Sequence, residues 1–309
     1  MNAARARLLV KSLTPPVVWD ALKRAKDSRR RAPGPAEQEA PIAAAQEAPV
    51  EPPEWEYVPE GWARASDPSV KGWDVEAIVD AYRAKWPSYV EAIEGSRPLG
   101  VYHEVVEGGD VWTHDHGAHN MLVSFAYVLA LAAHGKDRVS LLDWGGGIGH
   151  YYALAKAVLP DVEIDYSCRD VPKLVACGRE LFPDARFSVD ESCLERRYDL
   201  ILVSGSLQYS EDWPATLARL AGATGGYLYV TRLPVAFKAA SFVVLQRAYS
   251  YGYDTEYVGW VVNHDELLDE ARSAGLQLVR EFLLEARFSA AGAPENPVDH
   301  RGFLFRSPG

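Results

Sequence analysis

From residue 138 onward, short apolar runs alternate with amphipathic stretches. The apolar runs have the length and composition of buried strands, and they fall at residues 139–144, 162–169, 185–189, 200–204, 227–232, 277–284 and 302–306. The stretches between them have the spacing of helices that bury one face, at residues 149–158, 172–181, 213–221 and 263–275. This alternation predicts an α/β fold, a Rossmann-like doubly wound sheet of seven strands.

The region ahead of this pattern, residues 61–137, is predicted to be a helical cap. Asp74 stands where an N-cap residue would open a helix, and Pro87 is expected to end or kink that helix. The later patterns predict a short helix at 88–94, a strand at 101–106 and an apolar helix at 120–133. We expect these helices to cover the edge of the sheet where the ligand binds.

Two segments precede the cap. Residues 32–60 are rich in Pro, Ala and Glu, which indicates a flexible, disordered linker because few apolar side chains are present to offset the entropy of ordering. Residues 1–31 hold nine Lys or Arg and two Asp or Glu, a net charge of +7, and predict a basic arm broken at Pro15-Pro16. The main domain is predicted at residues 138–309, where the alternation of strands and helices lies.

The connection at residues 233–262 is too long for a simple loop and carries aromatic residues that include Phe242, Tyr249, Tyr251, Tyr253, Tyr257 and Trp260. Long insertions after strand ends often line substrate pockets. The alternative is a packing extension that covers the edge of the sheet. The sequence leaves both interpretations open.

The net charge of the chain limits the kinds of partner that it can bind. The net charge of the chain is −11, so residues 32–309 together carry −18. Phosphate binding needs clustered Lys and Arg, which argues against nucleic acid as a partner of the main domain. The arm at residues 1–31 is either solvated or makes a peripheral contact with an anionic membrane surface or another protein.

Cysteine content and hydropathy predict a cytoplasmic protein, with the membrane surface as the alternative location. The three cysteines are odd in number and form no Cys-x-x-Cys motif, as expected of reduced thiols. No run of about 18 apolar residues predicts a membrane span.

The motif that most strongly indicates a ligand-binding site is the glycine turn that follows the strand at 139–144. A strand, a glycine turn and a helix start together form a nucleotide-type pocket. The dinucleotide fingerprint Gly-x-Gly-x-x-Gly requires a glycine at position 150, which is His150 here, and no Gly-Lys-Ser/Thr of a phosphate loop follows. An NAD-type oxidoreductase therefore remains only an alternative.

The run from Asp143 to Gly149 has the form Asp-x-Gly-x-Gly-x-Gly and resembles motif I of the class I S-adenosylmethionine-dependent methyltransferases. The resemblance implies that S-adenosylmethionine is the cofactor. It places the methionine portion against the backbone of the turn and Asp143 near the ammonium group. The turn residues that this assigns to cofactor binding are Gly145, Gly146, Gly147 and Gly149.

The ribose and adenine are expected at the ends of the next two strands. Asp170 follows Gly149 by 21 residues, close to the interval of about 20 at which such folds place a ribose-binding acid. A carboxylate accepts hydrogen bonds from both ribose hydroxyls. Asp165 is the competitor, but it lies in mid-strand. Asp190 is expected to accept from the adenine amine, and Val171 to pack on the ring.

The end of the fourth strand, residues 204–209, faces the transferred methyl group in this architecture, so Ser204 and Tyr209 are site candidates. It lacks the Asn/Asp-Pro-Pro-aromatic tetrad of methyltransferases that act on adenine bases in DNA. Small-molecule O-methyltransferases that use a histidine base carry Leu-His-Asp-Trp near this point. Gln208 stands in place of that histidine, so a base at this position is in doubt.

Other residues are candidates for contact with the acceptor. His114, His116 and His119 lie close together in sequence, and histidine takes a hydroxyl proton near neutral pH. The alternatives are a polar loop and, third, a metal site, for which no matching Cys or carboxylate cluster exists; no metal is expected. Arg232 is placed to bind an anionic acceptor or to form an ordinary salt bridge.

A wider resemblance covers most of residues 61–309. Leu13-Thr14-Pro15-Pro16, the glycine turn, Asp170-Val171-Pro172 and the run at 204–209 are similar to a bacterial methyltransferase family whose members often accompany surface-polysaccharide genes. The resemblance implies O-methylation of a small molecule or a glycan, within polysaccharide biosynthesis. The alternatives are an NAD-type oxidoreductase and a non-catalytic methyltransferase-like binding module.

Overall fold

The computed structural model describes residues 52–96, 99 and 116–307. The chain divides into two units at Glu51, and the described residues all belong to the second unit. The basic arm, most of the linker, the strand expected at 101–106 and His114 lie outside the described residues. No helix within the described part is long and apolar enough to span a membrane.

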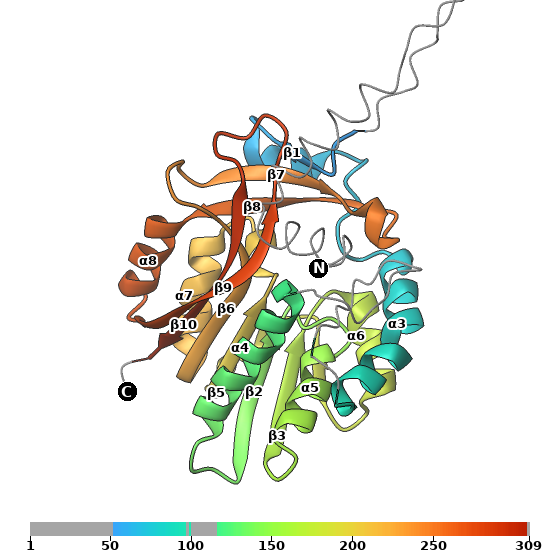
Figure 1. Ribbon diagram of the computed structural model, residues 1–309, viewed down its shortest axis with the longest axis vertical. Helices are drawn as coiled ribbons and strands as arrows, with labels where there is room; N and C mark the ends of the chain where they lie inside the picture. The colour runs from blue at the N-terminus through green and yellow to red at the C-terminus, as the bar shows by residue number, and fades with distance from the viewer. Residues whose placement is uncertain (1–51, 97–98, 100–115, 308–309) are drawn as a thin grey trace, which may run out of the picture. The chain divides into compact units, whose positions relative to one another are not determined.

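The seven predicted strands are all present and form the centre of the sheet (Figure 1). Six of them are parallel, and the last strand in the chain runs antiparallel between two others. In spatial order they are β4 (Arg186–Ser188), β3 (Glu163–Arg169), β2 (Arg138–Trp144), β5 (Tyr198–Ser204), β6 (Thr224–Ala236), β10 (Val298–Arg306) and β9 (Gln277–Phe288). The Rossmann-like α/β fold is therefore confirmed.

Both faces of the sheet are covered, which explains why its central strands are apolar throughout. Leu141 of β2 packs on the face covered by α4 (His116–Ala133), α5 (His150–Val158) and α6 (Pro172–Leu181). Leu142, one residue later, packs on the face covered by α7 (Trp213–Ala223) and α8 (His264–Ser273). Successive side chains of a strand point to opposite faces, so one apolar run supplies two cores.

The cap differs from the prediction in its first helix. Instead of two helices separated at Pro87, a single helix α3 (Glu76–Glu94) continues through that proline. Proline removes one helical hydrogen bond. Tyr82 before it and Tyr89 and Ile93 after it are buried against the domain, and this packing holds both halves in one helix.

Asp74 does not cap the helix it precedes. The N-cap of α3 is Val75, which has no side-chain cap bond. The Asp74 carboxylate instead accepts from the backbone N–H of Lys173 at 2.9 Å, in the first turn of α6. The predicted N-cap role of Asp74 is therefore wrong for α3, because its carboxylate binds a helix that begins almost a hundred residues later in the chain.

The long connection at 233–262 extends the sheet. It contains β7 (Phe242–Arg247), η4 (Ala248–Tyr251) and most of β8 (Glu256–Asn263), and β8 joins the far end of β6 at Val235 and Ala236. A short strand β1 (Trp55–Tyr57) pairs with β7, so the last residues of the predicted linker are partly a strand. The sheet thus has ten strands among the described residues, three more than predicted. The short 3-10 helices are η1 (Gly61–Ser66), η2 (Ser192–Glu195) and η3 (Leu207–Tyr209).

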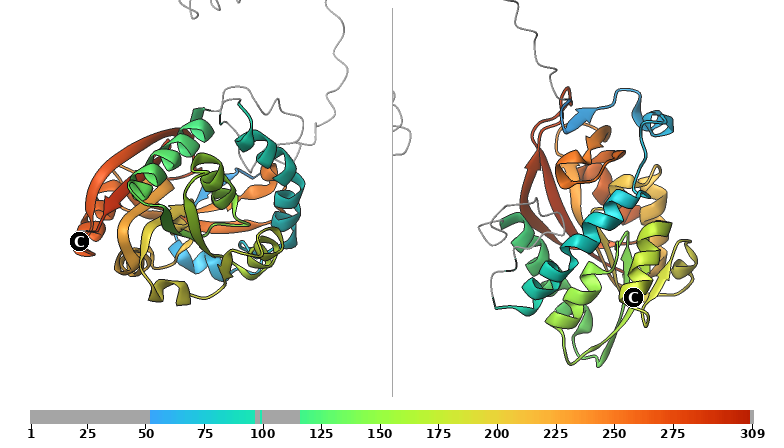
Figure 2. Two further views of the ribbon diagram at one scale, coloured as in Figure 1. Left: turned by 90° about the horizontal axis from the view of Figure 1, so that it is seen from below. Right: turned by 90° about the vertical axis from the view of Figure 1, so that its right-hand side faces the viewer.

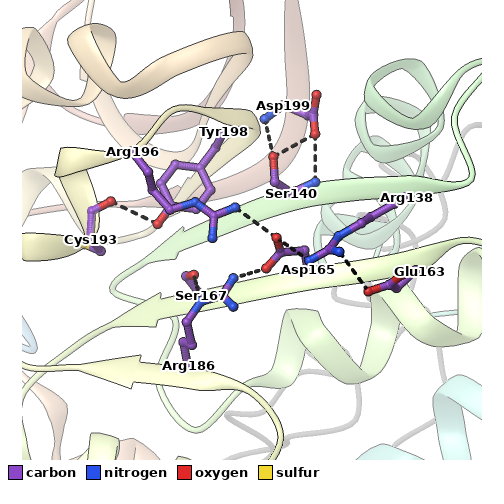
Figure 3. Close-up of polar contacts among 10 residues, drawn as sticks. All are labelled: Arg138, Ser140, Glu163, Asp165, Ser167, Arg186, Cys193, Arg196, Tyr198 and Asp199. Carbon is purple, nitrogen blue, oxygen red and sulfur yellow. Dashed lines mark hydrogen bonds and ion pairs between the residues drawn. The ribbon is translucent and has the colours of Figure 1, made fainter.

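Asp165 in β3 is the centre of an ion-pair network and faces three arginines (Figure 3). Arg138 lies 2.9 Å and Arg196 3.0 Å from its carboxylate, and Arg186 contacts the other oxygen. The Asp165 side chain is only 9% exposed, whereas the arginines are partly solvated. Asp165 therefore ties β2, β4 and the η2 segment to β3, and its carboxylate is engaged there.

We predict that Asp165→Asn lowers the free energy of unfolding by about 2 kcal/mol. Breaking a buried ion pair costs about 3–5 kcal/mol, and partial solvation of the arginines reduces this cost. Glu163→Gln is the control, because Glu163 is 65% exposed and pairs only with Arg138 at 3.5 Å. Urea denaturation should show a change below about 0.5 kcal/mol for the control. Equal stabilities of the two variants would contradict the role given to Asp165.

Candidate functional site

The glycine turn joins the end of β2 to the start of α5, as predicted. Gly145, Gly147 and Gly149 have φ angles of 75°, 62° and 101°, a left-handed conformation that favours glycine. A Cβ at Gly145 would lie 2.3 Å from Cβ of Ser206, and one at Gly146 2.4 Å from Cγ of Asp143. Packing within the protein therefore requires glycine at these positions, in addition to any close approach of a ligand.

Asp143 lies behind the turn and is fully buried. Its Oδ2 accepts from the Tyr166 hydroxyl at 2.9 Å, whereas its Oδ1 has no hydrogen-bond partner among the described residues. Burial raises the pKa of Asp143 from 3.8 to about 7; the Tyr166 bond opposes this shift and the charge of Asp170 adds to it. The turn therefore contains a buried acceptor that lacks a donor.

Asp170 follows β3 and lies directly against the glycine turn. Its Oδ2 accepts from the backbone N–H of Gly147 at 2.7 Å, and its Oδ1 from that of Val171 at 2.6 Å. Burial raises its pKa although these two bonds lower it. Its exposed fraction is 8%, and each carboxylate oxygen can accept more than one bond, so Asp170 retains capacity for a ligand.

Two other expected cofactor residues lie near the ends of β3 and β4. Val171 is the N-cap residue of α6 and packs against the cluster under α3. Asp190 is exposed, and its carboxylate accepts from the backbone N–H of Ser192 at 3.0 Å and from the Ser192 hydroxyl at 2.5 Å. These bonds lower the pKa of Asp190, so its carboxylate is charged and already engaged in the η2 turn.

The end of β5 is tied to the glycine turn and carries buried polar groups. The Ser206 hydroxyl donates to the carbonyl of Trp144 at 2.5 Å. The Ser204 hydroxyl lies 2.8 Å from the hydroxyl of Tyr151 in α5, and both residues are buried. Burial raises the pKa of Tyr151, and the positive charge of Arg232 opposes the shift, which places that guanidinium nearby.

Arg232 lies at a bend in β6. Its φ angle of 54° is left-handed, which is rare for a residue other than glycine. Its side chain packs beside Gly205, where a Cβ would lie 3.4 Å from Cζ of the guanidinium. Gln208 donates to the Arg232 carbonyl at 3.5 Å, and its own amide oxygen is buried without a partner in the described part of the chain. The bend therefore brings Arg232 next to the end of β5.

Tyr209 belongs to an aromatic cluster above this edge. Its ring lies 5.0 Å from that of Trp73 and 5.2 Å from that of Tyr257, centre to centre. Its hydroxyl donates to the side chain of Gln246 at 3.3 Å. Tyr257 and Gln246 come from the long connection, which thus both extends the sheet and packs against a site candidate.

His116 and His119, two of the candidate histidines, lie in different environments. His116 begins α4, is 74% exposed and lies 3.5 Å from Glu285. His119, one turn later, has a buried Nδ1 without a hydrogen-bond partner among the described residues. A tight turn joins α4 to β2, and the helix runs antiparallel to this strand, so the first turn of α4 lies at the carboxyl edge of the parallel strands (Figure 1). Within the described residues, no group of three His, Cys, Asp or Glu side chains is placed to bind a metal.

Most of the predicted residues therefore gather at one edge of the sheet. The glycine turn, Asp170, Ser204 and Arg232 meet where β2, β3 and β5 end, beside the bend in β6. The sequence did not indicate that Nδ1 of His119 is buried without a partner among the described residues, or that the Asp190 carboxylate accepts from Ser192. The burial of an imidazole nitrogen depends on the packing of α4, and no sequence pattern reports it.

This architecture defines a class of enzyme. The methyltransferase resemblance implies this arrangement: parallel strands that end at a glycine turn and an acidic residue, and a last strand that runs antiparallel. A family model described as a methyltransferase domain matches residues 118–281, more than half of the chain. The chain belongs to this methyltransferase family. It is an S-adenosylmethionine-dependent methyltransferase, which decides against an oxidoreductase and a non-catalytic module.

No curated protein matches the chain. Solved structures with a similar fold include a methyltransferase from Clostridium acetobutylicum, 10% identical, covering 64% of this chain and 94% of that one, with a TM-score of 0.41. Magnesium protoporphyrin IX methyltransferase from Synechocystis, solved with bound S-adenosylhomocysteine, is 13% identical, with coverages of 75% and 100% and a TM-score of 0.42. The [4+2]-cyclase SpnF is 15% identical, with coverages of 75% and 94% and a TM-score of 0.45.

The described residues fit the methyl donor chemically. The donor carries an ammonium group and a ribose diol, which both need acceptors. The turn supplies an unpartnered oxygen on Asp143 and a nearby carboxylate on Asp170. Because Asp143 is fully buried, a contact with the ammonium group requires the glycine turn to open slightly or a water molecule to mediate it.

Proposed function

We propose that this enzyme transfers a methyl group to a hydroxyl oxygen of a small molecule or glycan that also carries an anionic group. The observation behind this proposal is the buried edge at β5, where Ser204, Tyr151 and the guanidinium of Arg232 lie together. Hydroxyl groups and a guanidinium suit an oxygen-rich, negatively charged acceptor. The net charge of −18 outside the arm disfavours DNA.

On the donor side, we assign the roles by contact with the glycine turn. The backbone of residues 145–149 holds the methionine portion, with Asp143 behind it. Asp170 accepts from the ribose hydroxyls, and Val171 packs on the adenine. Asp190 lies beyond the end of β4, and both of its bonds from Ser192 go to Oδ1, so its Oδ2 can accept from the adenine amine.

On the acceptor side, Arg232 binds the anionic group, and Tyr209 forms part of the wall with its aromatic neighbours. When bound, S-adenosylmethionine supplies an electrophilic methyl group for in-line displacement. The acceptor hydroxyl must then lose its proton, and histidine is suited to accept it. His119 is better placed than His116, because its Nδ1 is buried and unpartnered whereas His116 is exposed and paired with Glu285. A peripheral membrane contact of residues 1–31 would serve a lipid-linked glycan acceptor.

The acceptor class is tested with donor labelled in the methyl group and two pools of saccharides, neutral sugars and uronic acids. We expect label in the uronic-acid pool, in an ether linkage that survives mild alkali. Arg232→Gln should reduce this transfer by about tenfold or more, because a charge-assisted hydrogen bond contributes about 1.5–3 kcal/mol. Label in an alkali-labile ester or on a nitrogen atom would contradict the proposal.

A further inference from the structure

Tyr82 on the cap helix lies directly against the glycine turn. A Cβ built at Gly147 would lie 3.3 Å from Cε2 and 4.0 Å from Cδ2 of Tyr82. The same ring lies edge-to-face with His150, the first residue of α5, with centres 5.1 Å apart. Tyr82 is only 5% exposed, so its ring is part of the surface that encloses the turn.

The helix that carries Tyr82 is fastened to the two helices that begin at the cofactor edge, α5 and α6 (Figure 2). The Asp74 carboxylate accepts from the first turn of α6, and Glu76 pairs with Lys173 at 3.2 Å. Further along α3, Arg83 pairs with Glu180 at 2.5 Å. The Tyr89 hydroxyl donates to the carbonyl of His150 at 2.9 Å. These contacts hold Tyr82 in place, so a ligand on the turn must lie beside its ring.

We propose that Tyr82 is a cofactor-binding residue whose ring contacts the positively charged methionine portion of S-adenosylmethionine. The inference rests on the proposed placement of that portion against residues 145–149. An aromatic ring attracts a cation within about 6 Å, and the attraction grows when water is excluded. The sulfonium of S-adenosylmethionine is such a cation, whereas S-adenosylhomocysteine has a neutral sulfur. Tyr82 therefore helps the enzyme prefer its substrate over its product.

The test compares the two ligands by isothermal titration calorimetry on the full-length protein. Tyr82→Phe keeps the ring and should bind both ligands within about twofold of the wild type. Tyr82→Leu removes the ring and should weaken S-adenosylmethionine by about tenfold, the order expected for a partly desolvated cation–π contact. The same variant should lose less affinity for S-adenosylhomocysteine, so the ratio of the two dissociation constants should change.

Tyr89→Leu is the matched control, because Tyr89 is a buried tyrosine on the same helix that also packs on His150. It should leave the ratio unchanged even if both ligands bind more weakly. An unchanged ratio in a folded Tyr82→Leu variant, or the same change in the control, would overturn the inference. Tyr82→Met replaces the leucine variant if that variant melts below the assay temperature. Failure of the wild type to bind either ligand would instead refute the proposed cofactor site.

Discussion

Replacing Asp170 with alanine should weaken the binding of S-adenosylmethionine by about two to four orders of magnitude. Two charge-assisted hydrogen bonds to the ribose hydroxyls contribute about 1.5–3 kcal/mol each, and 1.4 kcal/mol corresponds to a factor of ten. The carboxylate also accepts from the backbone of Gly147 and Val171, so its loss should additionally loosen the turn to which we assign the methionine portion.

These two effects are separable with a ligand that lacks one hydroxyl. In the wild type, 2′-deoxy-S-adenosylhomocysteine should bind at least tenfold more weakly than S-adenosylhomocysteine, because one bond to the carboxylate is missing. In Asp170→Asn, the difference between the two ligands should shrink, as a double-mutant cycle requires for interacting groups. Asp165→Asn is the control, because Asp165 lies in β3, the strand that Asp170 follows. The same discrimination in Asp170→Asn as in the wild type would show that the ribose acid is misassigned.

The second large effect is the pH dependence of stability caused by Asp143. Its pKa is about 7 in the folded protein, against 3.8 for an ordinary aspartate, so the folded state holds a proton that the unfolded state has released. The stability from this proton is complete below pH 4 and is lost as the pH rises through 7. With about 1.4 kcal/mol per pKa unit, the loss is about 4 kcal/mol.

Asp143→Asn should therefore be more stable than the wild type at pH 8 and lose this advantage at pH 4. The asparagine carbonyl still accepts from Tyr166, and no buried charge forms. Urea denaturation between pH 4 and pH 8 measures the difference. The stability of Asp143→Asn should still depend on pH to some extent, because burial also raises the pKa of Asp170. Parallel stability curves for the two proteins would contradict the assigned pKa.

Several elements were predictable because their signals are local. Helix α6 begins at Pro172 and ends at Leu181, as the pattern indicated, since proline favours the first turn and the apolar spacing ends there. Helix α8 begins after Asn263, whose side chain accepts from the backbone N–H groups of Asp265 and Glu266. The glycine turn was also recognisable, because its spacing alone separates methyltransferases from dinucleotide-binding proteins.

Other features depend on partners that are distant in sequence. Asp74 carries the chemistry of an N-cap, but only the packing of α3 on α6 directs it to Lys173. Pro87 predicts a break that burial of Tyr89 and Ile93 overrides. The connection at 233–262 could not be recognised as strands that extend the sheet, because an edge becomes available only when β6 runs beyond β5 to Ala236.

The sequence by itself determined the order of the seven central strands and the glycine turn, and thereby the type of cofactor, because these follow from side-chain periodicity and backbone freedom within short segments. Only the tertiary structure decided which polar atoms are buried without a partner among the described residues, as for Oδ1 of Asp143 and Nδ1 of His119, and which carboxylates are already engaged, as for Asp165 and Asp190. The reason is physical: the cost of an unpaired polar atom depends on what surrounds it, and those neighbours come from all parts of the chain.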